Sequence, residues 1–169
     1  MKRDLLGGLE RRRVAFRRAS VLLPAALLFT LSTLGSAALP TQALAQSVIR
    51  ISNDGGGSLP ARLKQIRSIR ANGQRVEIRR GFCNSACTLY LGLANTCVSP
   101  NARFGFHGPQ LATRGLNMLP KQFDEWSRTM ASHYPAELQS WFMGSARYSR
   151  KLITLKGSQL IAMGVQRCT

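Results

Sequence analysis

Ser85 stands where a predicted strand gives way to an apolar segment, residues 86–94, that has the composition of a buried helix. A serine at the N-terminus of a helix exposes its hydroxyl at the edge of a sheet. An oxyanion formed beside it gains from free backbone N–H groups and from the helix dipole. Such a serine can act as a nucleophile. Its commoner role is that of a helix N-cap, and position alone favours the cap.

Two further features make catalysis by Ser85 a working hypothesis. Three successive glycines, 55–57, follow the first predicted strand. Their backbone N–H groups can approach a carbonyl oxygen closely because no Cβ intervenes. His107 ends another predicted strand, 22 residues after Ser85. An isolated histidine is more often structural, but together with a serine and a glycine-rich turn it becomes a candidate general base.

The four cysteines all lie in the part of the chain that follows residue 45: Cys83, Cys87, Cys97 and Cys168. In a small exported domain an even number of cysteines predicts two disulfides, with three possible connectivities. A zinc site is the alternative, but three residues separate Cys83 from Cys87 and no histidine lies beside them. Disulfides are therefore predicted, and no metal or cofactor is expected.

The first 45 residues have the three parts of a secretory signal peptide. A basic stretch with seven Lys and Arg precedes an uncharged apolar run, 21–39, and small residues then end at Ala45. A retained membrane anchor is the alternative, but Pro24 and several Ser and Thr residues weaken the run. We expect residues 1–45 to be cleaved and the mature domain, 46–169, to be periplasmic or secreted. Membrane contact is expected only through an uncleaved signal segment.

The mature segment is long enough for one small domain. It holds 17 Lys and Arg against five Asp and Glu, a net charge of about +12. Such a charge attracts anionic partners in general. The basic residues are scattered and have no interleaved aromatic residues, however, so a solvated surface is favoured and no specific nucleic-acid partner is expected.

Hydrophobic periodicity predicts an α/β domain. Strands are expected at 48–52, 74–78, 96–98 and 103–106, and a sharp turn at 81–84. Helices are expected at 59–71, 86–94, 120–133, 135–143 and 154–163.

Three strings in this order resemble the proteolytic subunit of Clp protease, a member of the wider Clp/crotonase fold. They are SNDGGGS (52–58), CNSA (83–86) and PNARFGFH (100–107). The resemblance covers residues 48–109 and returns weakly at 153–165. It implies stacked βαβ units, a Ser85 nucleophile, a His107 base, and an oxyanion hole formed by the backbone N–H groups of Gly57 and Ala86.

The chain also departs from this family. The acidic third member of the catalytic triad should fall near residues 149–151, where the sequence has Ser-Arg-Lys. Asp124, Glu125 or Glu137 could replace it only if the fold brought one of them near, which we do not expect. The segment after His107 is short and broken by prolines, so the long oligomerising handle of the ring-shaped protease is not expected. Its aromatic residues are expected in the core or along a substrate groove: Phe123, Trp126, Tyr134, Trp141 and Phe142.

In the resembled fold, Cys97 opens a strand that lies beside the C-terminal segment, which implies the pairs Cys83–Cys87 and Cys97–Cys168. The first function hypothesis is an exported, ATP-independent serine hydrolase, most simply a peptidase. It would act on a peptide or protein substrate without an ATPase partner, as a possible homo-oligomer. The second is a catalytically inactive peptide-binding member of the same fold. Acyl-thioester chemistry is a distant third, because coenzyme A is a cytoplasmic cofactor.

Overall fold

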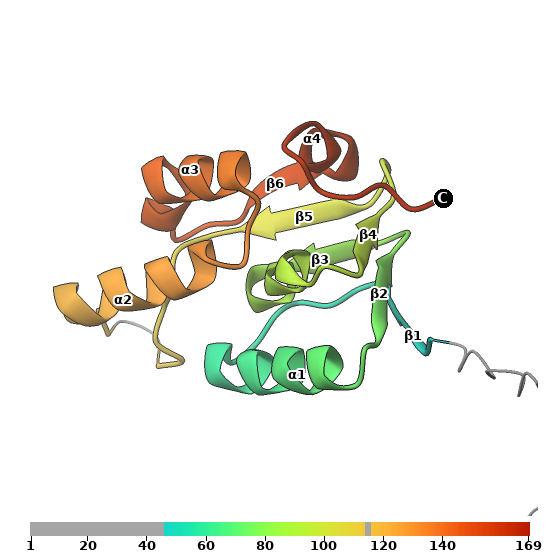
Figure 1. Cartoon of the computed structure of the whole chain (residues 1–169). Coiled ribbons are helices and arrows are strands. Elements are labelled where there is room, and N and C mark those ends of the chain that lie inside the picture. Colours follow the sequence, from blue (N-terminus) through green and yellow to red (C-terminus); the bar gives the residue numbers. More distant parts are fainter. Residues whose placement is uncertain (1–45, 114–115) are drawn as a thin grey trace, which may run out of the picture. The chain divides into compact units, whose positions relative to one another are not determined.

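The computed structural model describes residues 46–113 and 116–169, which form a mixed α/β structure with two three-stranded sheets (Figure 1). This confirms the predicted α/β class. The predicted signal peptide, residues 1–45, lies outside the described residues. Within the two described ranges, no helix combines the length and the apolar character needed to cross a membrane.

The first sheet has the order β1-β2-β4, and both of its pairings are parallel. Its strands are β1 (Val48–Ile51), β2 (Arg75–Ile78) and β4 (Thr96–Val98). Helix α1 (Leu59–Ala71) connects β1 to β2. Its N-cap is Ser58, whose hydroxyl accepts a hydrogen bond from the Ala61 N–H at 3.4 Å, and Pro60 occupies its first turn.

The second sheet has the order β3-β5-β6 and carries the residues of interest. Strand β3 (Phe82–Asn84) pairs in parallel with β5 (Arg103–Phe106), which pairs antiparallel with β6 (Ile153–Lys156). The short 3₁₀ helix η1 (Ser85–Gly92) follows β3 directly, and His107 follows β5 directly. The two predicted catalytic residues therefore lie directly after the carboxyl ends of two neighbouring parallel strands.

The remaining helices follow β5 along the chain. They are α2 (Pro120–Ala131), α3 (Ala136–Gly144), the 3₁₀ helix η2 (Ala146–Tyr148) and α4 (Gly157–Ala162). In Figure 1, α2 and α3 lie at the end of the molecule toward which β5 points. The aromatic residues between Phe123 and Phe142 divide between the core, as one of the two predicted locations, and the lining of a pocket. Tyr134 and Phe142 are buried and meet edge-on, whereas Trp126 lines the pocket described below.

The hydrophobic core is built around η1, because six consecutive residues of this helix, 86–91, are buried. Val76 and Ile78 of β2 and Phe104 and Phe106 of β5 are also almost wholly buried. Burial of this kind stabilises by about 25 cal/mol per Å² of apolar surface. The buried residues that follow Ser85 in η1 thus fix the position of Ser85 at the start of this helix.

Two predicted elements are wrong in detail. The expected turn at 81–84 is largely the strand β3, because Phe82–Asn84 finds a parallel partner in β5. Gly81 and Ser85, which both have positive φ, flank this strand. The expected helix at 154–163 begins only at Gly157, because the preceding residues form β6, in which Leu155 lies opposite Phe104. In both places long-range strand pairing decides the local structure, and the sequence pattern does not reveal it.

Candidate active site

Ser85 sits on a sharp turn between a strand and a helix. Its φ of +53° places it in the left-handed region, which costs a non-glycine residue free energy and persists only when the surroundings enforce it. A strained serine between a strand and a helix is also how hydrolases with a nucleophile elbow expose a reactive hydroxyl. The N-cap of η1 is Asn84, and no hydrogen bond of the Ser85 hydroxyl is found among the described residues. The N-cap role considered for Ser85 is therefore not the one it has.

The glycine-rich turn packs directly against this serine. Main-chain hydrogen bonds tie Asp54 to β3, from the Asp54 N–H to the Phe82 oxygen at 2.9 Å and from the Asn84 N–H to the Asp54 oxygen at 2.8 Å. The Asp54 carboxylate also accepts a hydrogen bond from the Gly56 N–H at 2.8 Å. Within the described ranges, the N–H groups of Gly57 and Ala86 have no partner. Both residues line the same pocket as Ser85.

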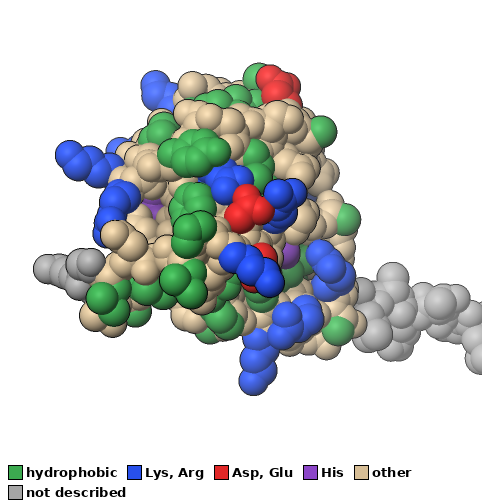
Figure 2. Space-filling view, turned by 90° about the vertical axis from the view of Figure 1, so that its left-hand side faces the viewer, with side chains coloured by type: hydrophobic (Ala, Val, Ile, Leu, Met, Phe, Trp, Pro, Cys, Tyr) green, Lys and Arg blue, Asp and Glu red, His purple; other side chains and the backbone are tan. Residues whose placement is uncertain are grey.

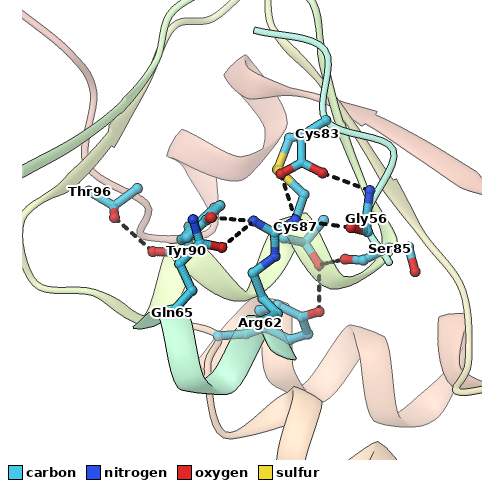
Figure 3. The surroundings of a disulfide bond; sticks show 11 residues. Gly56, Arg62, Gln65, Cys83, Ser85, Cys87, Tyr90 and Thr96 are labelled. Atoms are coloured by element: carbon cyan, nitrogen blue, oxygen red, sulfur yellow. Dashed lines mark hydrogen bonds and ion pairs between the residues drawn. A yellow bond between two sulfur atoms is a disulfide. The ribbon is translucent and has the colours of Figure 1, made fainter. Parts of the chain in front are cut away.

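Arg62 of α1 holds the turn from below (Figure 3). It is 9% exposed, and it donates hydrogen bonds to the Asp54 carboxylate at 2.6 Å and to the Gly56 carbonyl at 3.0 Å. It also bonds the hydroxyl of buried Tyr90, and burial raises the pKa of that tyrosine. A paired, hydrogen-bonded charge is the form in which an arginine can be buried. Arg62 therefore holds the turn that carries Gly57, one of the two candidate oxyanion donors.

His107 is partly buried at the end of β5. Its Nδ1 lies 2.6 Å from the Gly108 carbonyl oxygen and 3.2 Å from the side-chain nitrogen of Gln110. No partner for its Nε2 is found among the described residues. No hydrogen bond between Ser85 and His107 is found there either, although catalytic hydrogen bonds are often long before substrate binds.

A pocket of about 430 Å³ brings these groups together. It is lined by Ser85, His107, Gly57 and Ala86, and by apolar residues that include Leu59, Leu111, Trp126 and Met130. Figure 2 views the molecule from the side on which β5 ends and α1 begins. Hydrophobic side chains lie to the left of the middle of that face, next to Asp or Glu side chains that are flanked by Lys and Arg, and further Lys and Arg side chains lie toward the edges. The pocket can thus admit an apolar group beside the serine hydroxyl.

No carboxylate takes the place of the expected acidic partner of His107 within the described residues. Asp124 is engaged by Arg128 at 2.7 Å and by Arg147 at 2.8 Å, and the hydrogen bond from Arg128 lowers the pKa of this carboxyl. Around the positions where the resemblance places the acid, Ser149 and Arg150 instead contribute main-chain oxygens. These oxygens accept hydrogen bonds from the Gly108 N–H and from the Gln110 side chain.

Both expected disulfides are present. Cys83 is joined to Cys87 and Cys97 to Cys168, which leaves no free cysteine in the described part of the chain. The zinc alternative is therefore wrong for these four residues. Cys83 and Cys87 bracket Ser85, so that bridge constrains the turn that carries the serine (Figure 3). Two disulfides indicate an oxidising environment, as for an exported protein.

Three contributors to the site do not appear among the sequence predictions. Arg62 has a signal in hindsight, because it shares one buried helix face with Ile66 and Ile69 at helical spacing. Met130 lies one turn after Trp126, which was expected in the core or a groove, on α2, and both line the pocket. The Gly108 carbonyl has no signal, since a main-chain oxygen carries no residue type.

No family model matches the chain, and no curated protein matches it either. The chemistry assigned to the site therefore depends on the geometry of its residues. The likeness to the Clp protease proteolytic subunit stays a prediction based on the three sequence strings.

Proposed function

We propose that this chain is an exported, ATP-independent serine hydrolase, most simply a peptidase, with the Clp/crotonase arrangement of stacked βαβ units. Ser85 is the nucleophile and His107 the general base. The N–H groups of Gly57 and Ala86 form the oxyanion hole. The residues of the site come from the first half of the domain, and α2 contributes the apolar wall.

One observation supports this proposal above the others. Ser85 is held in a left-handed conformation, on a turn tied to the glycine-rich segment. It opens into the same pocket as a histidine and two backbone N–H groups that have no partner among the described residues. Strained residues of this kind concentrate at functional sites. A purely structural serine needs neither the pocket nor the free donors.

The chemistry follows from these positions. Ser85 Oγ attacks the carbonyl carbon of a bound peptide or ester while His107 accepts the hydroxyl proton. The carbonyl oxygen becomes an oxyanion that accepts hydrogen bonds from the Gly57 and Ala86 N–H groups. His107 then donates its proton to the leaving group, and water hydrolyses the acyl-enzyme by the reverse sequence. No ATP is needed, and accessible segments of a polypeptide are the expected substrates.

The test is hydrolysis of fluorogenic peptides and activated esters that carry an apolar group on the acyl side. The protein is purified after export with its disulfides intact. We expect Ser85→Ala to abolish turnover and His107→Ala to lower kcat/KM by about 10²- to 10⁴-fold. Matched controls are Ser158→Ala, an exposed serine on α4, and His133→Ala, the other histidine of the chain. Equal rates in wild type and Ser85→Ala would exclude Ser85 as the nucleophile.

A catalytically inactive peptide-binding protein is the second candidate. The absence of a carboxylate on His107 among the described residues favours it, because an orienting acid is worth orders of magnitude in rate. The main chain of an extended peptide could still gain affinity from the same free N–H groups. Saturable peptide binding that is equal in wild type and Ser85→Ala, with no turnover of any ester, would establish this function instead.

A further inference from the structure

Two polar groups lie near Nδ1 of the His107 ring, and they require opposite protonation states of this nitrogen. The Gly108 carbonyl oxygen, 2.6 Å away, can only accept a hydrogen bond. The side-chain amide nitrogen of Gln110, 3.2 Å away, can only donate one. The protonation state of Nδ1 therefore depends on which neighbour prevails.

The Gly108 carbonyl prevails on distance. An unprotonated Nδ1 would set its lone pair against the carbonyl lone pairs at 2.6 Å, in exchange for a long hydrogen bond from Gln110. A protonated Nδ1 makes a short N–H···O bond instead. Rotating the amide of Gln110 does not change this choice. The amide nitrogen already donates to the Arg150 carbonyl at 2.9 Å, and rotation would place two oxygens there.

The carbonyl of Gly108 is held in position from two sides. The Gly108 N–H donates to the Ser149 oxygen at 3.0 Å. A β-carbon on Gly108 would lie 1.8 Å from the Arg147 oxygen, so only glycine fits against this chain segment. Gln110 ties the following residues to Arg150. Residues 147–150, from η2 onward, thus fix the main chain immediately after His107.

We infer that the main-chain carbonyl of Gly108 orients His107 in place of a carboxylate, with Gln110 as the positioning residue that fixes the loop carrying this carbonyl. The inference rests on the proposed function, because its consequence is catalytic. With the proton on Nδ1, Nε2 keeps its lone pair and can accept the proton of Ser85. A neutral carbonyl orients the ring as an acid would, but it offers an imidazolium less electrostatic stabilisation.

Nitrogen-15 NMR of the full exported protein with labelled histidines tests this inference directly. Protonated and unprotonated ring nitrogens have well-separated shifts, and with only two histidines in the chain a His133→Ala sample assigns the signals. At a pH where His107 is neutral, we expect its proton on Nδ1. A His107 that carries its proton on Nε2 would overturn the inference, whether or not the protein is active.

A variant tests the part assigned to Gln110. Gln110→Met keeps the length of the side chain and removes its hydrogen bond. Without the bond to Arg150 the loop can move the Gly108 carbonyl off Nδ1, and we expect this loss to outweigh the removal of the Gln110 donor. The Nε2–H tautomer should then become populated, and the rate at which a fluorophosphonate labels Ser85 should fall by about 10-fold or more. Gln139→Met, at an exposed position on α3, is the matched control and should change neither quantity. An unchanged tautomer and labelling rate in Gln110→Met would remove Gln110 from the account.

The two measurements separate failure of the inference from failure of the proposed function. A protein with the proton on Nδ1 whose Ser85 is never labelled is not a serine hydrolase, although the carbonyl contact stands. A protein whose Ser85 is labelled while the proton of His107 sits on Nε2 is a hydrolase that does not use the Gly108 carbonyl.

Discussion

Gly56 lies against Ser85 so closely that a β-carbon on the glycine would come within 2.6 Å of the serine Cβ and 2.7 Å of the Asn84 oxygen. The glycine-rich turn and the serine turn are therefore two halves of one packed unit. Arg62 braces the first half, and the Cys83–Cys87 bridge constrains the second. Any change that separates these halves should alter the serine before it alters the rest of the fold.

Gly56→Ala should disrupt this unit. The added carbon would contact β3 and the start of η1, and the φ of +103° is itself unfavourable for alanine. We expect a loss of stability of about 1–3 kcal/mol and loss of reactivity at Ser85. Chemical denaturation and fluorophosphonate labelling measure the two effects. Gly55→Ala is the matched control, because nothing lies within 4 Å of the position of its β-carbon. Equal behaviour of the two variants would contradict the packing described here.

Arg62→Met should weaken the support of the glycine-rich turn. The substitution leaves the partly buried Asp54 carboxylate without its cation, and breaking a buried ion pair in this way costs about 3 kcal/mol. We expect a lower free energy of unfolding and slower labelling of Ser85. Arg67→Met, at an exposed position of the same helix, should have little effect on either. If Arg62→Met were as stable and as reactive as Arg67→Met, Arg62 would have no part in holding the turn.

The two disulfides should differ in what they contribute. The Cys97–Cys168 bridge spans 71 residues and is worth up to about 4 kcal/mol in loop entropy, whereas the Cys83–Cys87 bridge spans only four and is worth about 2 kcal/mol. Replacing Cys97 and Cys168 by serines should lower the free energy of unfolding more than replacing Cys83 and Cys87. Replacing Cys83 and Cys87 should slow the labelling of Ser85 more than replacing Cys97 and Cys168. The reverse ranking in both measurements would show that the short bridge does not serve the site.

The ion pairs of Glu77 should make the free energy of unfolding depend on pH. The hydrogen bond from Arg79, at 2.8 Å, and the nearby charges of Arg75 and Arg50 lower the pKa of this carboxyl below its ordinary value near 4.5. A lowered folded-state pKa gives a stabilisation that is present above the unfolded-state pKa and is lost as the pH falls through the folded-state value. The free energy of unfolding should therefore decrease below about pH 4.5.

In Glu77→Gln the free energy of unfolding should decrease less steeply than in wild type as the pH falls below about 4.5. Chemical denaturation at a series of pH values compares this variant with Glu137→Gln, which alters an exposed carboxylate that has no ion pair within the described residues. A decrease of the same slope in wild type and Glu77→Gln would show that other carboxylates govern the transition.

The sequence predicted those parts of the fold that are decided locally. Helix α1 has the predicted bounds because Ser58, Pro60 and the periodic Ile66 and Ile69 act within one segment. Strand β3 was missed because Gly81 and Asn84 give its segment the composition of a turn, and its strand conformation depends on the pairing with β5. The first turn of the expected last helix was likewise lost to the pairing of Leu155 with Phe104.

The candidate site divides in the same way. Ser85, His107 and Gly57 were found because their residue types suggest chemistry, and the structure brings them to one pocket. The brace from Arg62 to Asp54 required knowledge of how α1 packs. The Gly108 carbonyl required the register of β5 against the segment after η2. Contacts made by the main chain after long-range packing cannot be read from residue types.

Covalent trapping of the nucleophile tests the central claim most directly. The protein, purified with both disulfides intact, is treated with a fluorophosphonate, digested and analysed by mass spectrometry. We expect one adduct, on the side chain of Ser85, which disappears in Ser85→Ala and forms more slowly in His107→Ala than in His133→Ala. An unmodified Ser85 at saturating probe, or an adduct on another residue that persists in Ser85→Ala, would contradict this claim.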